Sequence, residues 1–111
     1  MDCGCFDLPH QFDIVANPNA RTRRDFPFLI ILQSDRAASL STVIAAPLAL
    51  AGAAFKRSRI HPVIDVVGNR YLIFTERLAA IPTSSLGEPV STAAESRYEI
   101  IAALDMLFTG I

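Results

Sequence analysis

The sequence predicts an α+β fold, mainly β, in which a small antiparallel sheet or barrel is closed by one C-terminal helix. Three patterns support this prediction: a dense apolar run over residues 26–33, two strand-like runs that flank Gly68-Asn69, and apolar residues at helical spacing over residues 100–108. The chain has 111 residues, a length that favours one domain with one hydrophobic core.

The amino-terminal part of the chain predicts a leader, a strand and a loop. Residues 1–10 show no clear periodicity and are interpreted as an extension. Residues 11–16 alternate as a short strand does, and one face of that strand carries Phe12, Ile14 and Ala16. The Asn-Pro-Asn sequence at 17–19 indicates a turn, and residues 21–25 are predicted to form a charged loop.

The next segment predicts the centre of the sheet. Residues 26–33 are rich in aromatic and β-branched side chains, which is typical of a central strand covered on both faces, with Pro27 at its beginning or at an edge. Residues 34–41 are polar or small and are interpreted as a connecting loop. Residues 42–50 begin with Thr, Val and Ile, and we expect the strand to break at Pro47.

The clearest local structure is a hairpin. Residues 49–54, which precede it, are Ala-rich and fit either a strand or a short helix. Strand-like runs over residues 62–67 and 70–74 flank Gly68-Asn69. We expect these two residues to form the loop, because a tight hairpin needs positive φ angles that Gly and Asn tolerate.

The final helix has both a start signal and a stop signal. Residues 82–89 contain Pro and Gly and predict loops and short extended pieces. Thr92 and Glu95 then form a capping-box pattern, and Gly110 stands where a left-handed C-terminal cap belongs. The apolar residues that recur at helical spacing between these signals are Ile100, Ile101, Leu104, Leu107 and Phe108.

Composition excludes several classes of function. The formal net charge of −1 gives no general attraction to nucleic acid or anionic membranes. No stretch reaches the roughly 20 apolar residues of a spanning helix, and the N-terminus has no secretory-signal pattern, so we expect a cytoplasmic protein. Because 51% of the residues are hydrophobic, we expect some of them to be covered in a two-fold symmetric homodimer. The apolar end at 104–111 should pack into such a dimer or be presented to a partner.

Catalytic motifs are sparse in this sequence. It has no Gly-rich phosphate loop and no zinc-ligand spacing, and Ser84-Ser85 lacks the glycines of a nucleophile elbow. His61 is interpreted as a structural residue at a strand edge, and Asp65 and Glu76 as outward-facing charges rather than a catalytic pair.

Two clusters have open interpretations. Cys3, Cys5 and His10 could hold a metal, or they belong to a mobile leader; cysteines separated by one residue are poorly placed for a disulfide. The one basic cluster either grips phosphate or is a solvated face, and it consists of Arg21, Arg23 and Arg24.

Several short motifs, in order and spacing, resemble the CcdB toxin family of bacterial toxin–antitoxin modules. They are Gln11-Phe12, Gln33-Ser34-Asp35, Pro47-Leu48, Pro62-Val63, Ala80-Ile81-Pro82, Leu86-Gly87-Glu88 and the C-terminal Leu-Phe-Thr-Gly-Ile at 107–111. The resemblance covers residues 11–111, the expected toxin domain, and leaves residues 1–10 outside as an extension.

The resemblance implies a fold, partners and a mode of action. The fold would be a small SH3-like antiparallel barrel of the CcdB and MazF type with a C-terminal helix. Members of the family are homodimers that poison DNA gyrase through its A subunit while the enzyme holds cleaved DNA, and a CcdA antitoxin neutralises them. They have no catalytic activity, and we expect no cofactor.

The resemblance also implies gyrase-binding residues, but it leaves the antitoxin-binding residues unknown. The gyrase contacts would be Arg36, Ala37, Asp105, Phe108, Thr109, Gly110 and Ile111. The best-known toxin of the family has tryptophan at Thr109, isoleucines at Arg36 and Ala37, and asparagine at Asp105. Because threonine buries far less area than tryptophan, we expect the lost contact to exceed about 2 kcal/mol.

Two alternatives stay open, the first from these departures and the second from the relation of the barrel to MazF. In the first, the chain is a CcdB-fold homodimer that binds an antitoxin but has lost gyrase poisoning, with Asp105 and its neighbours serving dimerisation or a polar helix face. In the second, the chain is a MazF-like ribonuclease on the related barrel, with the arginines of residues 21–24 and Thr42 as its only candidates for catalysis.

Overall fold

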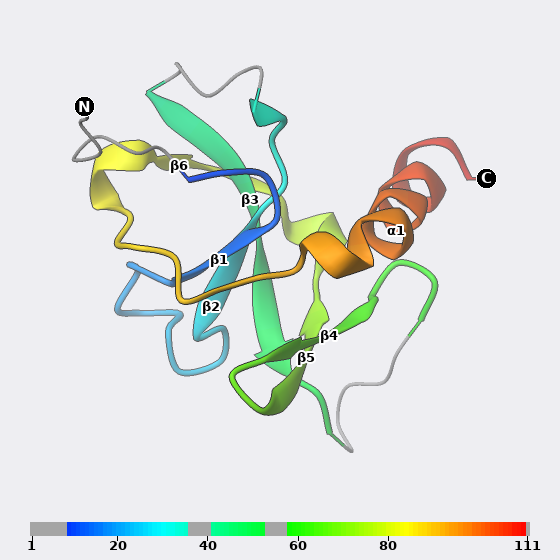
Figure 1. The fold of residues 1–111 in the computed structure, drawn as a ribbon, viewed down its shortest axis with the longest axis horizontal. Coiled ribbons are helices and arrows are strands. Elements are labelled where there is room, and N and C mark those ends of the chain that lie inside the picture. Colours follow the sequence, from blue (N-terminus) through cyan, green and yellow to red (C-terminus); the bar gives the residue numbers. More distant parts are fainter. Residues whose placement is uncertain (1–8, 36–40, 53–57, 111) are drawn as a thin grey trace.

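The computed structural model describes residues 9–35, 41–52 and 58–110 (Figure 1). Within them, seven strands form one antiparallel sheet that is followed by one α-helix. The elements are β1 (Asp13–Ala16), β2 (Phe28–Ile31), β3 (Thr42–Leu50), β4 (Val63–Val66), β5 (Asn69–Ile73), β6 (Ala79–Pro82), β7 (Ser91–Thr92) and α1 (Arg97–Thr109). Short 3-10 turns separate the later elements: η3 (Thr75–Arg77), η4 (Thr83–Ser85) and η5 (Ala94–Ser96).

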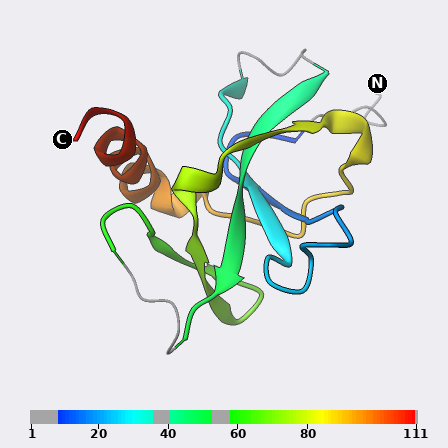
Figure 2. The ribbon, with the colours of Figure 1, turned by 180° about the vertical axis from the view of Figure 1, so that it is seen from behind.

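The long strand β3 joins two parts of the sheet. The strand order is β4-β5-β3-β2-β1-β7, and β6 pairs with β3 beside this path. The first half of β3 pairs with β6, from Thr42 opposite Pro82 to Ala45 opposite Ala79, and its last three residues pair with β5. Because β3 changes partner along its length, the sheet curls into a nearly closed barrel (Figures 1 and 2). The predicted mainly-β fold with a C-terminal helix is confirmed.

β3 does not break at Pro47, contrary to the sequence prediction. The strand runs without interruption over nine residues. Pro47 lies opposite Leu29 of β2, and its carbonyl accepts a hydrogen bond from the N–H of Phe74 on the other side of the strand. The proline nitrogen faces that same side, at the position where β3 passes from β6 to β5. The missing donor therefore falls in a gap of the ladder, where it breaks no strand-to-strand bond.

Both faces of the sheet carry apolar clusters. The larger cluster includes Ile100 of α1, so the helix covers this face of the sheet. The other buried members of the larger cluster are Phe12, Ile14, Ile30, Leu32, Ala46, Leu48, Ile64, Val66, Tyr71, Ile73 and Ala93. The neighbouring residues on the same strands point to the opposite face, because side chains alternate along a strand. They form two smaller clusters there, one around Val15, Leu29, Ile31, Val43 and Ala45 and one around Ala49, Leu72 and Phe74.

The first strands differ in detail from their prediction. β2 is a covered central strand as predicted, and it spans four residues of the predicted segment. β1 was predicted to alternate between two faces, yet Val15 is as fully buried as Ile14, while Ala16 is exposed. Val15 is buried because the second face of the sheet also carries an apolar cluster. Phe12 precedes β1 with a φ of 72°, so the strand begins at Asp13 rather than at residue 11.

The predicted hairpin is present, but its loop lies one residue earlier than predicted. Val66 pairs with Asn69, so the two loop residues are Val67 and Gly68. Both have positive φ, 47° and 86°. Asn69 instead begins β5. The ladder between β4 and β5 sets this register, because it places Ile64 and Val66 of β4 in the core.

Replacing Val67 with asparagine is expected to stabilise the fold by about 1 kcal/mol. A β-branched residue is strained at positive φ, and Val67 is 72% exposed, so its side chain contributes little packing. Asparagine tolerates this conformation and suits the first position of the loop. Urea denaturation of both proteins measures the difference. A midpoint that falls in the variant contradicts the assigned loop conformation.

No helix within residues 9–35, 41–52 and 58–110 has the length and apolar character that crossing a membrane requires.

Candidate protein-interaction site

The C-terminal helix is fixed to the barrel by one apolar side. Ile100 and Ala103 are buried, and Ile101 and Leu104 pack partly buried against the main core. Three of these positions were predicted from the helical spacing and Ala103 was not, and the four together hold α1 against the face of the sheet that the main cluster occupies. Other positions on the helix, among them Tyr98 and Phe108, are exposed to solvent or available to a partner.

The start of the helix differs from the predicted capping box. The Thr92 hydroxyl does accept a backbone hydrogen bond, but from the N–H of Ala94 at 3.2 Å. This bond reaches the first residue of the 3-10 turn η5, whose N-cap residue is Ala93, rather than the α-helix. The α-helix begins at Arg97, and its N-cap residue, Ser96, makes no side-chain cap bond. The reason is that η5 is inserted between the capping residue and the helix.

The end of the helix is closed as the sequence predicts. Gly110 has a φ of 76° and a ψ of 13°, the left-handed conformation of a C-terminal cap. Its N–H donates to the carbonyl oxygen of Met106 at 3.0 Å, and the Thr109 hydroxyl donates to the carbonyl oxygen of Asp105 at 2.6 Å. Two of the last carbonyl groups thus have partners, and the final turn has a defined shape.

The closed helix end presents an apolar ring beside small and acidic residues. Phe108 is 69% exposed, although its spacing had grouped it with the core-facing residues. Asp105, Thr109 and Gly110 around it are exposed as well. Figures 1 and 2 show this end of α1 at the periphery of the molecule. An exposed phenylalanine on a rigid turn is a typical anchor for a protein interface.

The structure brings together four of the seven candidate site residues. Asp105, Phe108, Thr109 and Gly110 share the end of α1. The three others, Ile111, Arg36 and Ala37, lie outside the residues that the structure describes.

Comparison with known proteins assigns this chain to a family. A family model described as CcdB protein matches residues 11–110. The chain belongs to the CcdB family. Among solved structures, the crystal structure of an Mtb toxin matches with a TM-score of 0.64 and 17% sequence identity, over 75% of this chain and 92% of that chain. At this identity the likeness supports the fold alone. No curated protein matches the sequence.

Three motif residues of this CcdB-family chain connect the segment before β1, the segment after β2 and strand β3. The backbone N–H of Gln11 donates to the Asp35 carboxylate at 2.7 Å, and the Gln11 side chain donates to the carbonyl oxygen of Leu32 at 3.1 Å. The Gln33 side chain accepts from the N–H of Ile44 at 3.3 Å. In this CcdB-family chain, Gln11, Gln33 and Asp35 therefore have a structural role, which their sequence pattern alone did not reveal.

The other polar candidates of this CcdB-family chain are also engaged structurally. His61 Nε2 lies 2.8 Å from Glu76 Oε1, and the His61 ring stacks on Phe74 with centroids 4.7 Å apart. Asp65 lies 3.8 Å from Arg70 instead, so Asp65 and Glu76 do not form a pair. These contacts agree with the structural interpretation of His61.

The structure describes the basic loop at residues 21–24, but it does not describe the cysteines of the leader. Arg23 donates to the carbonyl oxygens of Asn17 and Pro18 at 3.0 and 3.2 Å, which closes the loop on itself. Arg21 and Arg24 are exposed, as a solvated face would be. The cysteines of the metal hypothesis, Cys3 and Cys5, lie outside the described residues, and the structure shows no metal-ligand cluster in the part that it describes.

Proposed function

We propose that this protein is a toxin that poisons DNA gyrase by binding its A subunit, and that a CcdA-like antitoxin neutralises it. Membership of the CcdB family supports the toxin class. The observation that carries the gyrase assignment is the closed end of α1, where Phe108 is 69% exposed beside the Gly110 cap. A rigid apolar projection can wedge into a partner at small entropic cost, because its conformation is fixed before binding.

The proposed mechanism involves no covalent step. Phe108 would enter an apolar pocket of the gyrase A subunit, while Asp105 and Thr109 would contact its polar rim, with Arg36, Ala37 and Ile111 completing the surface. We propose residues 11–111 as the toxin domain, residues 1–10 as an extension, and a homodimer as the active form. Gyrase acts on chromosomal DNA, so the site of action would be the cytoplasm.

Removing residues 109–111 tests this function. Expression of the full chain in a gyrase-sensitive bacterium should arrest growth and accumulate gyrase-linked DNA breaks. The truncated chain should do neither, because it lacks the cap that shapes the final turn. Its folding can be checked by circular dichroism, since the helix keeps its buried anchors. Toxicity that persists after the truncation rejects the proposal.

A variant of this function is favoured by one observation. Thr109 turns its hydroxyl back onto the carbonyl of Asp105, so this side chain adds little apolar area to the exposed end. A CcdB-fold homodimer that binds antitoxin without poisoning gyrase is therefore the second candidate. It predicts no growth arrest from the full chain, together with retained binding to the antitoxin. The ribonuclease alternative predicts cleavage of RNA by the pure protein, which incubation with RNA decides.

A further inference from the structure

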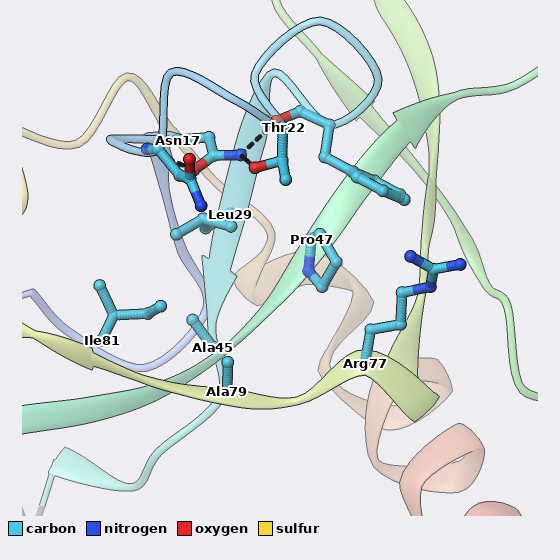
Figure 3. Close-up of a pocket in the computed structure, with 10 residues that line it drawn as sticks. Asn17, Thr22, Leu29, Ala45, Pro47, Arg77, Ala79 and Ile81 are labelled. Carbon is cyan, nitrogen blue, oxygen red and sulfur yellow. Dashed lines mark hydrogen bonds between the residues drawn. The ribbon is translucent and has the colours of Figure 1, made fainter.

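A pocket of about 200 Å³ lies on the face of the sheet opposite the main core (Figure 3). It lies between the β1–β2 loop and β6, and no residue of α1 lines it. Its apolar lining comes from three segments that are far apart in sequence: Phe26, Leu29, Ala45, Pro47, Ala79 and Ile81. The two smaller apolar clusters of this face flank the pocket, since Leu29 and Ala45 belong to one and Phe26 packs against the other.

One wall of the pocket is a rigid polar loop. Asn17 is buried, and its side-chain amide donates to the Thr22 hydroxyl at 2.9 Å and to the carbonyl oxygen of Phe26 at 2.8 Å. The same side chain accepts from the N–H of Asn19 at 2.9 Å. Three bonds from one side chain hold the loop in place, so this wall exists before any ligand binds.

Among the described residues that line the pocket, Arg77 is the only charged one. Its guanidinium lies 5.2 Å from the ring centre of Phe26 and 5.8 Å from that of Phe74. The two rings meet edge to face, with centroids 5.4 Å apart. Within the described residues, no carboxylate forms an ion pair with Arg77. A cation that aromatic rings hold in position beside an apolar pocket favours a ligand that joins an apolar group to an anion.

The strand beside the pocket can receive an extended chain. β6 pairs with β3 along one edge, and no strand in the described part of the chain pairs with its other edge. Ala79 and Ala80 are small and exposed, so they leave room along this edge. An extended peptide can hydrogen-bond to such an edge and place alternate side chains in a neighbouring pocket.

We propose that this pocket binds an extended acidic peptide of a partner protein, with an apolar side chain in the pocket and a carboxylate on Arg77. The charge of the site fits a peptide better than a nucleic acid. Single-stranded nucleic acid needs a row of cations along its backbone, whereas Arg77 is the one cation among the described residues that line this pocket and the chain carries a net charge of −1. Of the arginines on the neighbouring loop, Arg23 is bonded to the carbonyl oxygens of Asn17 and Pro18, and the exposed Arg21 and Arg24 add to the attraction for an acidic peptide. The inference is independent of the end of α1 and stands whether or not gyrase is the target.

A designed peptide tests the proposal. The probe is a fluorescein-labelled peptide of two Ser-Leu-Ser-Asp repeats, in which leucine and aspartate share a face because residues two apart do so in an extended chain. Fluorescence anisotropy with the full chain should show saturable binding that weakens with added salt. Peptides with lysine in place of aspartate, or serine in place of leucine, should bind at least tenfold more weakly.

Two pairs of variants locate the binding site. Arg77→Met keeps the length of the side chain but removes its charge, and Arg97→Met is its control, because Arg97 also lies over a phenylalanine, 5.7 Å from the Phe12 ring centre. Ala79→Leu fills the pocket, and Ala80→Leu places the same bulk at the next position of β6, on the opposite face of the strand. Arg77→Met and Ala79→Leu should each weaken binding at least tenfold, and the two controls less than twofold.

Several results would overturn the proposal. They are the absence of peptide binding, equal affinity of the Arg77→Met variant, and equal or tighter binding of a single-stranded oligonucleotide of matched length. The last test measures the oligomeric state of the Ala79→Leu variant by analytical ultracentrifugation. A shift from dimer to monomer in this variant, without a shift in Ala80→Leu, would assign the pocket to a second copy of the chain instead.

Discussion

Replacing Phe108 with alanine is expected to abolish growth arrest while leaving the barrel folded. An aromatic anchor at the centre of an interface typically contributes about 2 kcal/mol or more, and its loss weakens binding by about 30-fold. Phe108 is 69% exposed in the free protein, so its truncation should change the free energy of unfolding by no more than about 0.5 kcal/mol. Growth curves, the yield of gyrase-linked DNA breaks and calorimetry with the purified gyrase A subunit measure the two effects separately.

The matched control for Phe108 is on the same helix. Tyr98 is 82% exposed and lies at the opposite end of α1, so Tyr98→Ala removes an exposed ring of similar size away from the proposed site. This variant should remain toxic. Arrest that survives Phe108→Ala but disappears in Tyr98→Ala would move the interaction surface to the start of the helix.

Replacing Ile100 with alanine is expected to destabilise the protein by about 3 kcal/mol, because the truncation leaves a cavity between α1 and the sheet. Ile100 is fully buried and is the large residue of α1 that enters the main cluster. A domain of this size has a total stability of about 5–15 kcal/mol, so the thermal midpoint should fall by about 10–20 °C. Urea and thermal denaturation give both numbers.

The neighbouring residue provides the comparison for Ile100. Ile101 is only partly buried against the same cluster, so Ile101→Ala removes the same atoms from a position that water already reaches. We expect it to cost about 1 kcal/mol. Equal losses from the two substitutions would show that α1 is not anchored through Ile100.

Sequence predictions were confirmed for elements whose conformation depends on residues within the same short segment. The Gly110 cap, the hairpin between residues 62 and 74 and the covered strand β2 are all present. Each depends on residues close in sequence: a glycine free to adopt positive φ, a pair of turn residues, or an unbroken apolar run. For the same reason, the grouping of Asp105, Phe108, Thr109 and Gly110 at one helix end could be predicted.

Sequence predictions were wrong where contacts with a segment distant in sequence set the conformation or the exposure of a residue. Pro47 should break a strand, yet β3 continues because the change of partner from β6 to β5 leaves no ladder bond for its nitrogen to make. Phe108 has the spacing of a core residue but is exposed, and the last turn of α1 lies at the periphery of the molecule (Figures 1 and 2). The residues next to Pro47 and Phe108 do not indicate which strands pair with β3 or which helix turn is covered by the sheet.

The sequence by itself determined the class of fold, the position of the helix and its cap, and a family pattern over residues 11–110. Only the tertiary structure decided that Phe108 faces outward, that Val67 rather than Asn69 occupies the turn, and that Arg77 lies beside a pocket. The physical reason is the range of the interactions. Turns and caps are closed by hydrogen bonds between near neighbours, whereas exposure and pockets arise where strands and loops distant in sequence meet or fail to meet.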